Sequence, residues 1–88
     1  PDYMKLYGRG GIMIEVERGK TINNNMDLLD FWKCHISNKL NCLILIIPNK
    51  VPRKKASALI YNSVVRRMKP LFDKKNYSNV MALAIIDY

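Results

Sequence analysis

The chain has 88 residues, 49% hydrophobic and 25% charged, and its 15 basic and 7 acidic residues give a net charge of +8. This size and composition predict a single globular domain and exclude a disordered segment. The excess of positive charge favours a polyanionic partner, nucleic acid before an anionic membrane. The longest apolar run, from Cys42 to Pro48, is too short to span a bilayer, and no secretory signal opens the sequence.

The two cysteines and the first residue of the sequence bear on the cellular compartment and on the upstream elements of the protein. Cys34 and Cys42 lie in apolar surroundings without metal-ligand spacing, so we expect reduced thiols and a cytoplasmic protein. The sequence begins at Pro1 without a starting methionine, and we expect that elements upstream of this one domain, residues 1–88, are missing.

The first elements form a predicted β-hairpin. Residues 3–7 alternate weakly, and the glycines at positions 8, 10 and 11 favour a tight turn into a second strand over residues 12–17. On that second strand Glu15 and Glu17 share one face with Met13, because successive side chains in a strand alternate between faces. The two carboxylates are therefore expected to project side by side.

A helix is predicted from Met26 to about Leu40, with Asn24 and Asp27 spaced as in a capping box. Its apolar residues recur every three or four positions and predict one buried stripe. The stripe comprises Leu28, Leu29, Phe31, Trp32, His35 and Ile36. On this stripe His35 is expected to be a core histidine bonded to backbone or water, in preference to a ligand or base.

Residues 42–47 form a continuous apolar run, typical of a central parallel strand covered on both faces. A second helix follows Pro52 and ends near Lys69, before Pro70, and a last strand covers residues 80–86. The inner face of the second helix is expected to contain Ala56, Leu59, Ile60, Val64 and Met68. The order β-β-α-β-α-β predicts a hairpin followed by two right-handed crossovers, hence a three-layer α/β domain with a mixed four-stranded sheet.

Carboxylates on this hairpin could hold a cation. The hairpin brings Asp2 across from the second strand, where Glu15 and Glu17 lie within reach of one ion. Magnesium binds one or two carboxylates together with carbonyl, water and phosphate oxygens. A solvated strand face with Glu at alternate positions is the structural alternative.

Pro1-Asp2, the hairpin, and Glu15-Val16-Glu17 on a strand before a helix together resemble the signature of the PD-(D/E)xK nuclease superfamily. The resemblance implies a restriction-endonuclease-like core that hydrolyses DNA with Mg²⁺ or Mn²⁺. It implies that Asp2 and Glu15 ligate the metal with help from the Val16 carbonyl.

The sequence departs from the usual motif at Glu17, which stands where most members have lysine. Glu17 could orient or deprotonate the attacking water. Lys20 or Lys33 could supply the missing ammonium from a displaced position, and an inactive relative would also lack the motif lysine. We therefore predict Asp2, Glu15, Glu17 and Lys20 as catalytic residues.

The loop before the first helix is a candidate phosphate-binding segment, because a helix N-terminus favours anions. The predicted nucleic-acid contacts are Arg18, Lys20, Thr21, Asn23, Asn24, Asn25 and Lys33. A capping turn rich in asparagine is an equal alternative. The basic face of the second helix is more typical of a solvated surface than of a DNA contact, and it comprises Arg53, Lys54, Lys55, Arg66, Arg67 and Lys69.

Three functions are consistent with these patterns. A metal-dependent DNA endonuclease is the first, and a homodimer would suit it because a double break requires two cuts. A non-catalytic DNA-binding or structural subunit with the same fold is the second, and a small basic interaction module is the third.

Overall fold

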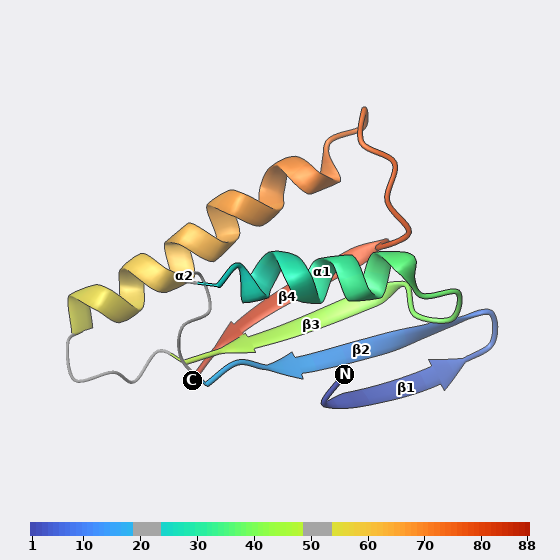
Figure 1. Ribbon diagram of the computed structural model, residues 1–88, viewed down its shortest axis with the longest axis horizontal. Helices are drawn as coiled ribbons and strands as arrows, with labels where there is room; N and C mark the ends of the chain where they lie inside the picture. The colour runs from blue at the N-terminus through green and yellow to red at the C-terminus, as the bar shows by residue number, and fades with distance from the viewer. Residues whose placement is uncertain (19–23, 49–53) are drawn as a thin grey trace.

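The computed structural model describes residues 1–18, 24–48 and 54–88, with side chains for all of these except 54–59. It is a small α/β domain, as predicted (Figure 1). In chain order its elements are β1 (Tyr3–Tyr7), β2 (Gly10–Val16), α1 (Met26–Ile36), β3 (Cys42–Ile47), α2 (Lys54–Met68), the 3₁₀-helix η1 (Lys69–Phe72) and β4 (Ala82–Asp87). In the described parts of the chain, no helix has the length and apolar character needed to cross a membrane.

The strands form one open mixed sheet in the order β1-β2-β3-β4. β1 and β2 are antiparallel and are joined at Gly8, whose φ of 48° lies in the left-handed region that glycine adopts without strain. β2, β3 and β4 are parallel to one another. The predicted hairpin and the predicted four-stranded mixed sheet are therefore confirmed.

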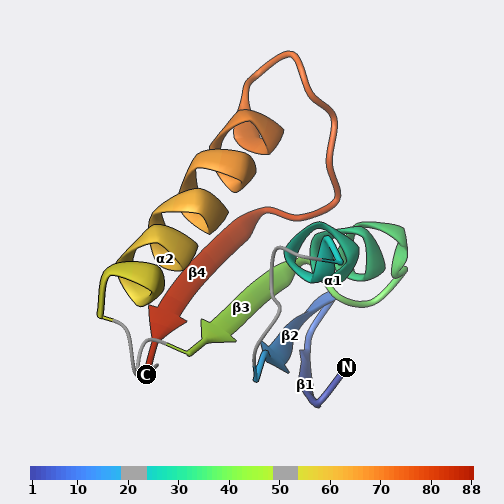
Figure 2. The ribbon, with the colours of Figure 1, turned by 60° about the vertical axis from the view of Figure 1, so that its left-hand side comes forward.

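Both helices pack on the same face of the sheet (Figure 2). The order β2-β3-β4 means that both crossovers step in the same direction, and crossovers of one hand that step the same way leave their helices on one side. The buried core between helices and sheet contains Met13, Phe31, Cys34, Leu40, Leu43, Leu45, Ile47, Val64, Met68 and Val80.

The opposite face of the sheet has no layer over it among the described residues. Burial alternates along β3, with Leu43, Leu45 and Ile47 buried while Ile44 and Ile46 are only half-buried. The expectation that this strand is covered on both faces is therefore wrong for the described residues, which form two layers. An apolar run of strand length does not reveal whether a third layer exists.

Strand β2 turns its acidic face toward the helices. Met13 and Glu15 are buried under them, whereas Ile12, Ile14 and Val16 lie on the open face and are half-buried. The alternative that the Glu15 side forms a solvated strand face is thus wrong, since Glu15 is only 5% exposed.

Helix α1 is rotated in a similar way. Asp27 and Asp30 are fully buried, while Leu29, Trp32 and Ile36 from the predicted apolar stripe are 44%, 56% and 60% exposed. This part of the predicted stripe is wrong, because the three residues form an apolar ridge on the outer side of the helix.

The ends of α1 also differ from the prediction. The N-cap is Asn25, with φ 54° and no side-chain cap, so the capping box expected from Asn24 and Asp27 does not form. The helix ends at Ile36 because Ser37 is extended and its hydroxyl accepts hydrogen bonds from the N–H groups of Lys39 and Leu40 at 3.2 and 3.1 Å. It is therefore shorter than the predicted span to about Leu40.

The second helix and last strand agree with prediction more closely. Val64 and Met68 are buried and Ile60 is half-buried, as expected for the inner face of α2. The helix stops at Met68, and Pro70 occupies the first turn of η1. β4 begins at Ala82, two residues later than predicted, after the buried Val80.

We predict that Leu45→Ala, at a fully buried position of β3, lowers the free energy of unfolding by about 2–5 kcal/mol because it leaves a cavity. Ile44→Ala, on the open face of the same strand, should cost distinctly less. Urea unfolding of the two variants measures the difference. Equal losses would contradict the two-layer arrangement, since they would require a covering on the open face.

Candidate metal centre

Three carboxylates meet between β2 and α1. Glu15 points from β2 toward the helix, Glu17 follows the end of that strand, and Asp30 faces the sheet from α1. Glu17 is held by its backbone N–H, which donates to the Ile46 carbonyl at 2.8 Å. One carboxylate oxygen of each of the three acids lies within 4.8 Å of the others. This spacing matches a set of oxygen ligands around one cation.

Burial and like charge raise the pKa of Asp30. Loss of contact with water is the main cause, followed by a hydrogen bond with Glu17 and the charges of Glu17 and Glu15, while Lys33 opposes them, and the pKa rises to about 8. Neither Asp30 oxygen has a hydrogen-bond donor among the described residues when the acids are charged. A hydrogen bond between two carboxyl groups requires a proton on one of them. The centre therefore needs either that proton or a cation.

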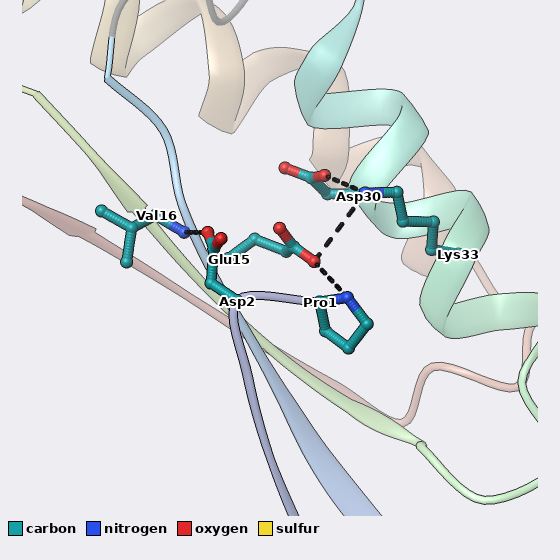
Figure 3. A network of polar contacts seen from close by, with 6 residues as sticks. All are labelled: Pro1, Asp2, Glu15, Val16, Asp30 and Lys33. Atoms are coloured by element: carbon teal, nitrogen blue, oxygen red, sulfur yellow. Dashed lines mark hydrogen bonds and ion pairs between the residues drawn. The ribbon is translucent and has the colours of Figure 1, made fainter.

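Lys33 stands over the cluster from the next turn of α1 (Figure 3). Its Nζ lies 3.6 Å from Asp30 Oδ1 and 3.9 Å from Glu15 Oε1, and its side chain is 41% exposed. The Pro1 nitrogen lies 3.5 Å from the same Glu15 oxygen. Of the two lysines considered as a displaced ammonium, Lys33 is thus at the carboxylates, whereas Lys20 lies outside the described residues.

Asp2 lies beside the acidic cluster and is not one of its three members. Its Oδ2 accepts a hydrogen bond from the Val16 N–H at 2.8 Å (Figure 3). Continuing the β1–β2 register, in which Tyr3 pairs with Ile14, by one residue puts Asp2 opposite Glu15. The hairpin therefore brings these residues together as expected, but Asp30 occupies the place beside Glu15 that the sequence assigned to Asp2.

A third buried acid, Asp27, links the two helices. Arg67 of α2 places Nη2 3.2 Å from Asp27 Oδ1, and the same nitrogen donates to the Asn25 side chain at 2.7 Å. Asp27 is fully buried, whereas the Arg67 side chain is 26% exposed. Asn25 and Arg67, both predicted to face nucleic acid or solvent, instead tie the start of α1 to α2.

Apart from His35, the other basic and polar residues singled out in the sequence are exposed where the structure describes their side chains. Arg18 and Asn24 are exposed, and Arg66 extends along α2 to the Ser63 hydroxyl at 3.3 Å. The predicted residues Thr21, Asn23 and Arg53 lie outside the described residues, as do the side chains of Lys54 and Lys55. His35 is half-buried and its Nδ1 accepts the Asn79 N–H at 3.0 Å, which agrees with the expected structural role.

Neither Asp27 nor Asp30 was predicted from the sequence to be a buried acid. Their spacing of three residues was a usable signal, because acids at positions i and i+3 share one helix face, here the face that also buries Phe31. The stronger apolar pattern of Leu29, Trp32 and Ile36 pointed to the opposite side of the helix.

Comparison of the chain with family models, with curated proteins and with solved structures finds no match.

The raised pKa of Asp30 predicts an unusual pH dependence. Between its ordinary value of 3.8 and about 8, the folded chain binds more protons at Asp30 than the unfolded chain. Asp30 thus makes the free energy of unfolding fall as the pH rises through this window, by at most ~1.4 kcal/mol per pH unit. Urea unfolding in EDTA across the window should show this slope in the wild type and a reduced slope in Asp30→Asn. Asp73→Asn, at an exposed position, should keep it, and identical profiles in all three proteins would refute the assignment.

Arg67→Ala should destabilise the domain by about 2–3 kcal/mol, somewhat less than loss of one partner from a fully buried pair, because Arg67 is partly exposed. The neighbouring Arg66→Ala is the matched control and should change stability by less than ~0.5 kcal/mol, as for ordinary surface positions. Thermal and urea unfolding measure both. A cost for Arg66→Ala as large as that for Arg67→Ala would contradict a specific pairing with Asp27.

Proposed function

We propose that this domain is a metal-dependent nuclease whose metal ligands are Glu15, Glu17 and Asp30. The observation that carries the proposal is that β2 and α1 both bury acids while several of their apolar residues, such as Leu29 and Trp32 on α1, face outward. Burying acids where apolar side chains were available lowers stability, and such exceptions to local rules are expected at functional sites. The resemblance of Asp2 and Glu15-Val16-Glu17 to the PD-(D/E)xK motif independently favours the same chemistry.

A divalent cation fits this centre. Mg²⁺ and Mn²⁺ take oxygen ligands, and Asp30 contributes buried oxygens that have no donor among the described residues. When bound, such an ion polarises a phosphate and lowers the pKa of a bound water. Its charge would also oppose burial, the main cause that raises the pKa of Asp30 to about 8, and would offset the charges of Glu17 and Glu15.

Three side chains at or near the cluster have separate roles in the proposed reaction. Glu17 is half-buried at the end of β2 and accepts the proton of the attacking water. The exposed end of Lys33 attracts the substrate phosphate and offsets its charge, in place of the absent motif lysine. Asp2 stays hydrogen-bonded to Val16 and holds the strand that carries Glu15 in position.

DNA is the proposed substrate because the chain carries a net charge of +8, which favours a polyanion. We also propose that the fold is the restriction-endonuclease-like core, whose third layer would cover the open face of the sheet. A reducing cytoplasm suits Cys34 and Cys42, which are both free thiols.

The test is cleavage of plasmid and single-stranded DNA with Mg²⁺ or Mn²⁺. Glu15→Gln and Asp30→Asn should each reduce the rate at least ~100-fold, since electrostatic and metal contacts of this kind supply rate factors of that size. Asp73→Asn is the matched control and should cleave as the wild type does. In EDTA, Asp30→Asn should be at least as stable as the wild type, which separates lost activity from lost folding.

Two results would overturn this proposal. Absence of cleavage with either metal is one, and DNA binding without cleavage would then favour the non-catalytic subunit of the same fold. Equal cleavage by the wild type and Glu15→Gln is the other, because it would place the activity outside this centre.

A further inference from the structure

A pocket of about 360 Å³ lies on the other side of α1 from Lys33, between that helix and the segment that follows η1. Its volume is at the lower end of the range for small-molecule sites. It is lined by Leu28, Phe31, Trp32, His35, Leu71, Asn76, Tyr77 and Ser78.

Aromatic rings at the pocket are left open to solvent. Trp32 is 56% exposed and Tyr77 is 95% exposed. The Trp32 ring contacts the His35 ring, with 5.5 Å between their centroids. The Phe31 and Phe72 rings meet edge to face, with 5.7 Å between their centroids. Phe31 is thus packed in the core, while Trp32 and Tyr77 remain largely exposed to solvent.

Polar groups at the pocket are fixed by the protein. The Asn79 N–H donates to His35 Nδ1, so a neutral His35 carries its proton on Nε2. The Asn76 side-chain nitrogen donates to the Pro70 carbonyl at 2.6 Å, which leaves its carbonyl oxygen uninvolved in that bond. An aromatic wall with a few oriented donors and acceptors suits a heterocyclic base.

Positive charge adjoins the aromatic wall on one side, because Lys74 and Lys75 precede Asn76 and are exposed. Side chains that stack on bases, combined with cations that meet the backbone, are the means by which proteins bind single strands.

We propose that this pocket binds an unpaired nucleobase of a single-stranded nucleic acid, stacked on Trp32 and Tyr77. The inference rests on the proposed nuclease function and narrows its substrate to strands with unpaired bases near the cut. A base is favoured over a peptide because the outer side chains of the pocket are aromatic and the adjoining Lys74 and Lys75 are cationic.

The chain has one tryptophan, so its emission reports directly on the pocket. In EDTA, a short oligothymidylate should quench Trp32 fluorescence, and a strand of the same length built from abasic residues should not. With a fluorescently labelled oligothymidylate, Trp32→Ala and Tyr77→Ala should each weaken binding about fivefold to hundredfold, the range for loss of one stacked base. Tyr3→Ala is the matched control, because Tyr3 is 65% exposed on β1.

The outcomes separate this inference from the nuclease proposal. Quenching without cleavage would support the base pocket and contradict the nuclease proposal. The Trp32 emission of Glu15→Gln should still be quenched by the oligothymidylate. Equal affinity for the abasic strand, or unchanged Trp32 emission with bound oligothymidylate, would overturn the pocket. A shift of Trp32 emission with protein concentration alone would also overturn it, in favour of contact between copies of the chain.

Discussion

Carboxyl groups buried under α1 constrain the rest of the domain. Glu15, Asp27 and Asp30 are at most 5% exposed, where an unpaired charge costs several kcal/mol. Arg67 pairs with Asp27 and thereby ties α2 to α1. Near the other two acids, Lys33 is the cationic side chain within 4 Å among the described residues. The positions of both helices thus depend on how these buried carboxyl groups are paired.

The topology explains why this centre can exist in a thin domain. Both crossovers place their helices on one face of the sheet, so that a single core and the acidic cluster share that face. Strand β2 then has to divide its side chains between a covered acidic side and an open apolar side. The same division on α1 leaves Leu29, Trp32 and Ile36 outside and supplies the pocket with its tryptophan.

Local patterns in the sequence predicted the strands Tyr3–Tyr7 and Cys42–Ile47 and the start of α1 at Met26, because these depend on alternation, turn residues and spacing. They also singled out Glu15 and Glu17 as neighbours. Asp30 was not assigned, because the most apolar stripe of the helix indicated another side, and the side that faces the sheet is set by tertiary packing. The two-layer arrangement of the described residues was equally hidden, since it depends on the direction of both crossovers.

The acidic cluster is also local in the chain. The four residues of the centre come from β2, the loop after it and α1, and they are Glu15, Glu17, Asp30 and Lys33. The later elements contribute core residues and Arg67, which pairs with Asp27. The centre is therefore modular. Insertions in the turns beyond α1 would lengthen the chain without separating any of these four residues along it, and surface turns tolerate such changes. An insertion inside β2 or the first turns of α1 would shift the acids onto different faces.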